Sequence, residues 1–352
     1  MIKKTELTGV KEIARRANVS IGTVDRVIHN RKGVSDATRQ KINLIIEEIN
    51  YQPNKMASLL ASKKILNFAV LIPDISVETD YWTYPLNGIE QAGEEVKQFG
   101  ITIQYFFYDL HSRDSFNKAA EELLNCNPQA ILLAPSFIEE STAMVKRINE
   151  LNIPLVFINS DLPKQPSLTY IGPELYQSGR LAAQLTSLSI AHEDEIMIIN
   201  ISTDLENDHH LVRKEQGFRT YFNDSKLTNP ITTLNIYETH IASVENAVLE
   251  ALQQNPNVKA FFVTNSRVNI VANILKKHNK THLLVGYDFL KSNINYLIDG
   301  QINFLICQRP KEQGYLAIMA LYKYLFNINE PEKAIYMPID IITKENYQFY
   351  NS

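Results

Sequence analysis

Residues 10–30 read VKEIARRANVSIGTVDRVIHN, and their apolar pattern fixes the fold of the first part of the chain. The first half carries apolar residues at helical spacing, which predicts a short helix: Val10, Ile13, Ala14 and Ala17. Asn18-Val19-Ser20 then interrupts the pattern, and the Ser20 hydroxyl can cap a second helix. That helix has an apolar face of its own, made by Val24, Val27 and Ile28. The stretch therefore predicts two short helices joined by a tight turn.

A third helix is expected directly downstream. Ser35 can cap it, and its apolar residues form a continuous helical stripe: Ile42, Ile45, Ile46 and Ile49. Three such helices are typical of a helix-turn-helix unit, whose second helix can enter a DNA major groove about 12 Å wide. An ordinary three-helix bundle is the alternative. We favour DNA binding because the second helix exposes a set of small and polar residues beside a net positive charge: Ile21, Gly22, Thr23, Asp25 and Arg26.

The distribution of charge separates this head from the rest of the chain. The 352 residues carry a net charge of −4. Residues 1–64 hold 13 Lys and Arg against 6 Asp and Glu, a net charge of +7, whereas the remainder holds 22 against 33, a net charge of −11. A basic module before an acidic body suggests a polyanion-binding head on a body that binds something else, although a merely solvated basic terminus is the alternative.

Together with VSDATR at 34–39 and INYQPN at 49–54, the opening stretch resembles the lactose and galactose repressor (LacI/GalR) family. The match covers nearly all of residues 8–62. The resemblance implies base-reading roles for Ile21, Gly22 and Arg26, and roles in positioning the DNA backbone for Thr23, Asn30 and Tyr51.

Arg26 is the residue we expect to read a base most strongly. Its guanidinium can donate two hydrogen bonds to guanine O6 and N7, which is worth about 1–3 kcal/mol of discrimination. Asp25 departs from the family, which usually has Ser at this position. A carboxylate near phosphates is repelled unless it pairs with Arg26 or accepts from a cytosine amino group, so the operator sequence stays open.

Residues 54–63 form a helix-capable segment after Pro53. Isolated helices shorter than about 12–15 residues are marginal, so this segment needs bracing. In the family it is the hinge helix, which folds when two copies meet on DNA. The resemblance implies that Leu60 enters and kinks the minor groove. We add Ser20, Asp25, Asn54 and Lys55 to the expected DNA contacts. A plain linker is the alternative reading of this segment. For the whole chain we expect a DNA-binding domain at 1–53, a hinge at 54–64 and an effector-binding, dimerising domain at 65–352.

The body alternates apolar, strand-like runs with amphipathic helical stretches. Apolar runs joined by helices are typical of parallel sheets in doubly wound α/β units, and nine of them indicate two units. The predicted strands are 68–72, 102–108, 130–134, 155–158, 196–201, 232–237, 260–264, 283–287 and 304–307.

Polar residues recur where these strands end, which is where ligands of open α/β sheets bind. They are Asp74, Asp109, Asn159, Asp161, Ser202, Asn265, Asp288 and Gln308. Each residue taken singly has a structural alternative, because helix caps and turns also favour Asp and Asn. Neutral amides and carboxylates suit a polyol, because they accept from or donate to hydroxyl groups without needing a charged ligand.

Over residues 65–345 the body resembles the type I periplasmic sugar-binding fold, which the repressor family uses as its effector domain. The resemblance implies that Tyr81 and Trp82 stack on a sugar ring, with simple loop packing as the alternative. In the RKEQGF run at 213–218 the Arg sits one residue early, so whether Arg213 or Lys214 faces the cleft stays open. The expected effector-binding residues are Asp74, Tyr81, Trp82, Asn159, Asp161, Arg213, Asn265, Asp288 and Gln308.

Signals for catalysis, metals and membranes are weak. No two glycines are separated by one residue, so the Gly-x-Gly of a dinucleotide fingerprint is absent, and there is no Gly-x-Ser-x-Gly elbow. Two cysteines cannot build a thiolate-rich zinc site, and His278 and His282 lack a nearby third ligand. The first 20 residues lack the apolar core of a secretory signal. We therefore expect no enzyme activity, metal, cofactor or membrane contact, and a cytoplasmic location.

The sequence thus predicts an α/β protein with an N-terminal all-α helix-turn-helix head and a two-lobed, doubly wound, periplasmic-binding-protein-like domain. The expected function is that of a sequence-specific transcription regulator, a repressor of carbohydrate metabolism genes. A homodimer would bind double-stranded operator DNA under the control of a sugar or sugar-phosphate effector. A cytoplasmic sugar-binding or sugar-processing protein with a basic interaction module is the alternative. The identity of the effector, the direction of its effect and any oligomer beyond a dimer stay open.

Overall fold

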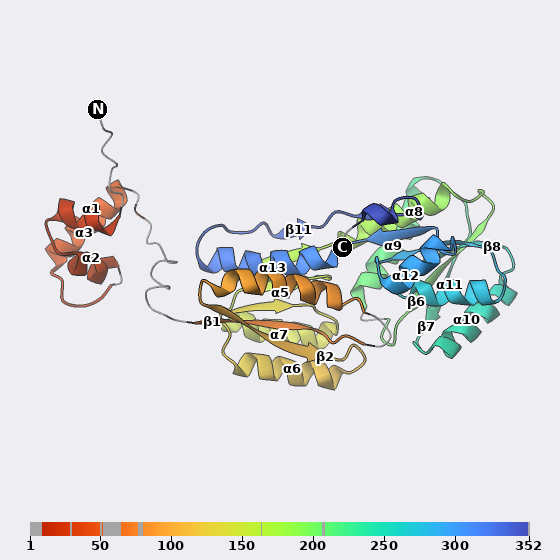
Figure 1. Cartoon of the computed structure of the whole chain (residues 1–352), viewed down its shortest axis with the longest axis horizontal. Coiled ribbons are helices and arrows are strands. Elements are labelled where there is room, and N and C mark those ends of the chain that lie inside the picture. Colours follow the sequence, from red (N-terminus) through yellow and green to blue (C-terminus); the bar gives the residue numbers. More distant parts are fainter. Residues whose placement is uncertain are drawn as a thin grey trace, which may run out of the picture. The chain divides into compact units, whose positions relative to one another are not determined.

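The computed structural model describes residues 9–28, 30–49, 51, 65–76, 80–162, 164–205 and 208–350. It divides the chain into two compact units, Met1–Lys63 and Lys64–Ser352, which we call the head and the body (Figure 1). The expected hinge at 54–64, including Asn54, Lys55 and Leu60, lies outside the described residues.

The described part of the head forms three short helices around a small apolar core, as the sequence predicts. They are α1 (Val10–Ala17), α2 (Ile21–Ile28) and α3 (Asp36–Glu48). Ile13, Val24 and Ile42, one from each helix, are fully buried against one another. The turn before α2 is held by Ser20, whose Oγ accepts from the Thr23 amide at 3.1 Å, and Ser35 caps α3 in the same way. These contacts fix how α2 is presented at the surface.

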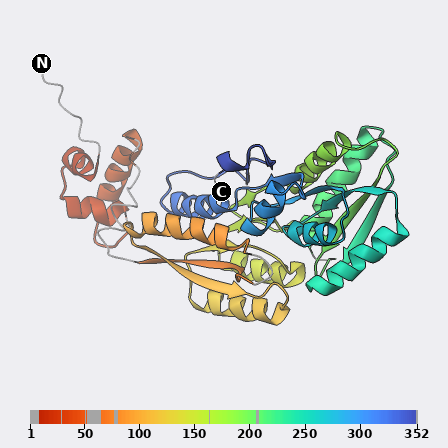
Figure 2. The ribbon, with the colours of Figure 1, turned by 45° about the vertical axis from the view of Figure 1, so that its right-hand side comes forward.

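The first lobe of the body is built on a six-stranded parallel sheet within the described part of the chain. Its strand order is β11-β5-β4-β3-β1-β2, which confirms the predicted doubly wound arrangement. Helices α5 and α13 lie side by side over one face, and α6 and α7 cover the other (Figures 1 and 2). The bounds are β1 (Leu66–Pro73), α5 (Thr83–Lys97), β2 (Ile101–Tyr108), α6 (Arg113–Asn125), β3 (Ala130–Leu133), α7 (Ile138–Glu150), β4 (Leu155–Ile158), β5 (Thr169–Gly172), α13 (Pro310–Leu325) and β11 (Ala334–Tyr336).

The second lobe repeats this plan. Its described strands run in the order β12-β10-β9-β8-β6-β7, all parallel except that β12 is antiparallel to β10. Helices α8 and α9 pack on one face of the sheet, while α10, α11 and α12 pack on the other. The bounds are α8 (Leu175–Ser187), β6 (Glu195–Ile201), α9 (His209–Asp224), β7 (Ile231–Ile236), α10 (Ile241–Gln254), β8 (Val258–Val263), α11 (Val268–Lys277), β9 (Leu283–Tyr287), α12 (Lys291–Ile298), β10 (Phe304–Cys307) and β12 (Asp340–Ile342).

The chain passes from one lobe to the other after β5, after β10 and after β11. These crossings bring the C-terminal ends of both sheets towards a common cleft, the position where open α/β sheets bind ligands. All nine predicted strands are present, with bounds shifted by a few residues. The sequence prediction missed β5, β11 and β12, which are three or four residues long.

Each lobe contains one helix pair that is packed through glycines. In the second lobe, a Cβ on Gly179 of α8 would lie 1.9 Å from the Lys214 carbonyl oxygen on α9, and a Cβ on Gly217 would lie 1.9 Å from the Tyr176 oxygen. In the first lobe, a Cβ on Gly88 of α5 would lie 1.9 Å from the backbone oxygen of Lys311 on α13. Only glycine permits helix backbones to approach this closely. The α8–α9 contact therefore sets the position of the residues at the start of α9.

Candidate functional site

The exposed face of α2 carries most of the predicted DNA-reading residues. Val24 and Val27 point into the core of the head, which leaves Gly22 and Arg26 exposed and Ile21 51% exposed. An exposed isoleucine beside an exposed arginine is what a helix that inserts into a groove would present.

The remaining predicted DNA contacts of the head have structural partners. Thr23 Oγ1 lies 2.9 Å from Ser20 Oγ, and Tyr51 is half-buried against the core of the head. Asn30 has a left-handed backbone (φ 49°), and its Oδ1 accepts from Arg39 at 2.9 Å. Asp25 Oδ2 accepts from Arg31 Nη1 at 3.2 Å, so the acidic residue that departs from the family pattern is offset by an arginine just beyond α2.

The body contains a cleft between its two lobes, lined by the loops that follow the sheet strands. Seven of the nine predicted effector-binding residues line it: Tyr81, Trp82, Asn159, Asp161, Asn265, Asp288 and Gln308. They come from both lobes. A ligand bound between them would therefore touch both halves of the body at once.

The first-lobe wall is aromatic. Tyr81 and Trp82 make an edge-to-face contact with ring centroids 5.2 Å apart, and Trp82 is 5% exposed. The Tyr81 hydroxyl donates to Asn159 Oδ1 at 2.7 Å. Burial raises the pKa of Tyr81 well above its usual value, so the hydroxyl stays a hydrogen-bond donor at neutral pH. This hydrogen bond fixes the side chain of Asn159, whose backbone is left-handed (φ 66°).

The second-lobe floor contains a buried pair of opposite charges. Gln308 Nε2 donates to Asp288 Oδ1 at 3.1 Å, and the Lys214 ammonium lies 3.6 Å from the centre of the Tyr287 ring and donates to the Thr264 carbonyl at 3.0 Å. Burial raises the pKa of Asp288 to about 6, against the opposing effects of Lys214 and Gln308. Burial likewise lowers the pKa of Lys214 to about 8, against the opposing effect of nearby Asp288. At pH 7 both groups are charged.

A buried glutamine joins the two lobes behind this floor. Gln313 is fully buried, its Nε2 donates to the Gln308 carbonyl at 2.8 Å, and its Oε1 accepts from the Asn159 amide at 3.0 Å. Gln313, which follows the crossing after β10, thus links Gln308 of the second lobe to Asn159 of the first.

Two predicted effector residues lie elsewhere. Asp74 is exposed, and its Oδ1 accepts from the amide of the next residue, Ile75, at 2.8 Å. Arg213 stacks over the Tyr176 ring at 5.1 Å and lines a second depression, which shares Asp161 and His209 with the main cleft. Lys214 lines the main cleft instead. The physical reason is helical geometry: one residue turns the side chain by about 100°, so only one member of the pair can face inward.

The sequence prediction missed several charged residues of the cleft. They are His111, Asp204, Asp208, His209, His210 and Arg267. Burial, with smaller contributions from Lys214 and His209, lowers the pKa of His210 to about 3, so this imidazole is neutral at pH 7. Their positions in the sequence could have predicted them. They lie in loops or helix starts just after β2, β6 and β8, and the ends of these strands were already expected to line the cleft.

Polar contacts between described residues cross the cleft from lobe to lobe. Arg113 Nη2 donates to Asp204 Oδ2 at 2.6 Å, His111 Nδ1 lies 3.1 Å from Thr203 Oγ1, and His209 Nε2 lies 3.5 Å from Asp161 Oδ1. The contact with His209 lowers the pKa of the Asp161 carboxyl. The lobes are therefore in contact around the cleft rather than spread apart.

The described residues contain no group of three or more His, Cys, Asp or Glu side chains arranged to hold a metal ion. Across the same residues, every helix falls short of the length and apolar character needed to span a bilayer.

Comparisons with known proteins define the class. Residues 9–54 match the bacterial regulatory proteins of the lacI family, and residues 68–328 match the periplasmic binding protein domain family. The fold and these matches place the chain in the class of regulators that carry a helix-turn-helix head on a two-lobed binding domain. A protein from Bacteroides fragilis classed as a LacI transcriptional regulator is 30% identical, with a TM-score of 0.77 over 82% of this chain and 100% of that one. This chain belongs to the LacI family, which confirms the predicted resemblance.

Other relatives are more distant. Catabolite control protein A of Staphylococcus epidermidis is 29% identical over 175 residues, which are 50% of each protein. The chain thus spans about half the length of the curated relatives it matches. GanP, a glucose-galactose binding protein from Geobacillus stearothermophilus, is 20% identical with a TM-score of 0.72, over 80% of this chain and 99% of that one. This likeness shows the fold of the body.

The buried carboxyl of Asp288 predicts a pH dependence of stability. Its pKa is raised from 3.8 to about 6 in the folded chain. The folded state therefore holds this proton more tightly than the unfolded state, and the stabilisation is full below about pH 4 and lost as the pH rises through 6. A difference of about two pKa units corresponds to about 3 kcal/mol.

Urea unfolding of wild type and Asp288→Asn between pH 4 and 6 measures this effect, with the fluorescence of Trp82, the single tryptophan, as the signal. The free energy of unfolding of wild type should fall relative to that of the variant across this range. A difference that is constant with pH would contradict the assignment.

Proposed function

We propose that this chain is a sequence-specific, DNA-binding transcription regulator of carbohydrate metabolism genes, acting as a repressor under the control of a small sugar or sugar derivative. The observation that carries the proposal is the combination, in one chain, of an exposed helix bearing Arg26 and a two-lobed cleft with an aromatic wall and a polar floor. The relatives named above are described as regulators and a sugar-binding protein, which supports a binding role rather than an enzymatic one.

The chemistry of the cleft supports a polyol ligand. The Trp82 ring offers an apolar surface for the C–H face of a sugar, while Asn159, Asn265 and Gln308 provide amide groups that both donate and accept. Asp288 provides a carboxylate acceptor for hydroxyl groups. Polar groups that converge within a mostly enclosed cleft are the usual means of selecting a small molecule.

The regulator would act as a homodimer in the cytoplasm, where it meets operator DNA. A protein with two-fold symmetry reads a near-palindromic operator whose half-sites lie about one helical turn apart. Effector binding would change how the two lobes meet and hence how the paired hinges lie on DNA, which couples the two ligands reciprocally.

A ligand screen tests the effector half of the proposal. Pentoses, hexoses, uronic acids and their phosphates are each added to the purified full-length chain, and thermal unfolding and Trp82 fluorescence are recorded. A ligand that binds only the folded state raises its stability, by about 2.7 kcal/mol at a hundred times its Kd. We expect at least one sugar to raise the unfolding temperature and change the fluorescence. Formation of a chemical product from that sugar without DNA would favour a sugar-processing enzyme instead.

Arg26→Ala should weaken operator binding and relax base preference at one position. The loss should be about 1–3 kcal/mol, because the expected bidentate contact to guanine disappears. The measurement compares affinities for the selected operator and for operators changed at single base pairs, at one salt concentration. Arg147→Ala, which removes a surface arginine paired with Glu121 on the body, is the matched control and should bind as wild type. An unchanged base preference in Arg26→Ala would exclude the assigned role.

A further inference from the structure

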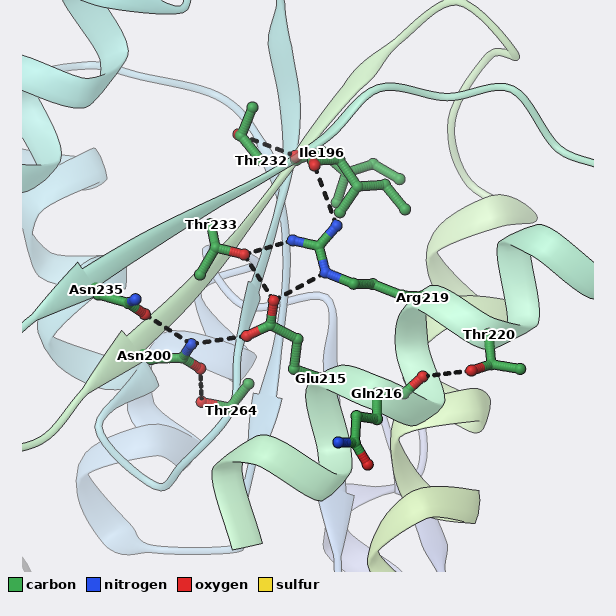
Figure 3. Close-up of polar contacts among 11 residues, drawn as sticks. Ile196, Asn200, Glu215, Gln216, Arg219, Thr220, Thr232, Thr233, Asn235 and Thr264 are labelled. Atoms are coloured by element: carbon green, nitrogen blue, oxygen red, sulfur yellow. Dashed lines mark hydrogen bonds and ion pairs between the residues drawn. The ribbon is translucent and has the colours of Figure 1, made fainter. Parts of the chain in front are cut away.

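A chain of polar side chains runs beneath α9, from the cleft lysine Lys214 to the edge strand β7. Figure 3 shows Glu215 and Arg219 on α9 directed toward the strands of the second sheet, where they meet polar side chains from β6, β7 and the end of β8. The members, in order from the cleft, are Lys214, Thr264, Asn200, Glu215, Asn235, Thr233 and Arg219.

Glu215 is held by three donors. Its Oε2 accepts from Asn200 Nδ2 at 2.9 Å, and its Oε1 accepts from Thr233 Oγ1 at 2.7 Å and from Arg219 Nε at 2.8 Å (Figure 3). The burial that would raise the pKa of this carboxyl is outweighed by these hydrogen bonds, and its pKa lies below the usual value. Glu215 is therefore a fixed carboxylate between α9 and the sheet.

Asn200 links Glu215 to Thr264, which lies nearer the cleft. Its Nδ2 donates to Glu215 and also to Asn235 Oδ1 at 3.0 Å, while its Oδ1 accepts from Thr264 Oγ1 at 2.7 Å. Both its amide hydrogens and its oxygen are in use, and the side chain is buried. Its orientation is therefore determined by its neighbours.

Thr264 connects the chain of contacts to the ligand site. It is fully buried at the end of β8, its hydroxyl donates to Asn200, and its carbonyl accepts from the Lys214 ammonium at 3.0 Å. The next residue, Asn265, lines the cleft and is itself held by a hydrogen bond from its Nδ2 to the Ile201 carbonyl at 2.8 Å. The position of Thr264 therefore determines the positions of two cleft groups.

We propose that Glu215, Asn200 and Thr264 are positioning residues that aim the Lys214 ammonium at one hydroxyl group of the effector. A lysine has a long, flexible stem and loses rotamer entropy when it is fixed in one geometry. Anchoring one of its three N–H donors on Thr264 leaves two donors for the ligand. The proposal deepens the proposed function and, for its ligand, rests on it.

Lysine titration tests the positioning in the unliganded full chain. The 13Cε NMR signal of Lys214, assigned by its absence in Lys214→Met, is followed against pH in wild type and variants. Thr264→Val and Glu215→Gln should each lower the pKa of Lys214 by about half a unit or more, because a looser carbonyl partner stabilises the charged form less. Thr264→Ser keeps the hydroxyl and should restore the wild-type titration.

Matched controls exclude a general effect of substitution. Thr220 Oγ1 donates only within α9, to the Gln216 carbonyl, and Figure 3 shows this contact apart from the network. Thr220→Val and the surface variant Glu121→Gln should therefore leave the titration of Lys214 unchanged. Identical titration curves for wild type, Thr264→Val and Glu215→Gln would overturn the proposal, whatever the effector is. If Thr264→Val and Glu215→Gln fail to fold, Thr233→Val replaces them, because it removes one donor to Glu215 without adding a charge. It should also lower the pKa of Lys214, and an unchanged titration would then overturn the proposal.

A second arm uses sugars as probes: D-glucose, D-galactose, D-arabinose and D-ribose with their monodeoxy analogues. Thr264→Val should weaken binding of the best of these sugars about 3- to 30-fold. One deoxy analogue, which lacks the hydroxyl group that Lys214 contacts, should bind Thr264→Val and wild type equally well. Lys214→Met should bind this same analogue as well as wild type does. Equal weakening for every analogue would show a merely structural role. If no compound of the sugar and sugar-phosphate screen binds while the Lys214 titration shifts, the proposed effector class fails and the positioning network stands.

Discussion

Gly179→Ala is expected to unfold about 5–10 °C below wild type and to bind effector more weakly. The new Cβ would lie 1.9 Å from the Lys214 carbonyl oxygen and 2.7 Å from its carbonyl carbon, which are backbone atoms that cannot turn away. Overpacking of this kind costs about 1–3 kcal/mol or more, whereas the gain in helix propensity is at most about 1 kcal/mol. Because α9 must move away from α8, the Lys214 ammonium must leave its place in the cleft.

Gly93→Ala is the matched control, since Gly93 also lies in a helix, α5. The nearest atom to its Cβ would be Ile103 Cδ1 at 2.9 Å, the far end of a flexible side chain that can shift. We expect this variant to unfold within about 2 °C of wild type and to bind effector normally. Thermal unfolding of both variants followed by Trp82 fluorescence is the measurement. An unchanged unfolding temperature for Gly179→Ala would show that α8 and α9 do not meet as closely as the structure has them.

Asp288→Ala is expected to weaken effector binding about 100-fold while operator binding without effector stays intact. The variant loses a buried, charged acceptor for sugar hydroxyls and leaves Gln308 Nε2 without its partner. A hydrogen bond to a charged group contributes about 1.5–3 kcal/mol, and about 2.7 kcal/mol corresponds to a hundredfold change in Kd. The response of operator affinity to effector should disappear at concentrations that saturate wild type.

Calorimetric titration of effector and a parallel operator titration measure both effects of Asp288→Ala. Asp299→Ala removes a half-exposed carboxylate that pairs with Lys276 on the surface, and it should behave as wild type in both titrations. Effector affinity within a factor of three of wild type in Asp288→Ala would remove Asp288 from the binding site.

The sequence was sufficient for the fold wherever long periodic segments carry the architecture. The helical stripes of the head and the nine predicted strands follow directly from their apolar residues. The sequence was not sufficient for β5, β11 and β12. The predicted strands β3, β4 and β10 are as short as β5, but each is a wholly apolar run, whereas β5 (TYIG) and β12 (DII) contain polar residues or glycine and β11 (AIY) has only three residues. These short strands complete the edges of the two sheets and depend on tertiary pairing that local sequence does not encode.

The cleft shows the same division. Asn159, Asn265, Asp288 and Gln308 could be anticipated because the ends of parallel strands meet at one edge of a sheet. Asp74 also follows the end of a strand, but its carboxylate accepts a hydrogen bond from the backbone amide of Ile75 instead of lining the cleft. The sequence does not show which of these two roles an aspartate after a strand takes. Lys214 could not be separated from Arg213, because the rotation of α9 is set by its glycine contacts with α8.

The central claim is that occupation of the cleft changes the affinity of the head for its operator. The most direct test is a titration of the full-length chain against a duplex selected from a random library, at one salt concentration, with and without the sugar that changes Trp82 fluorescence most. We expect clear preference for the selected duplex over random competitor, and a change of about 5- to 150-fold in operator Kd when the sugar is saturating. Equal binding to all duplexes, or an operator Kd that the bound sugar leaves unchanged, would contradict the claim.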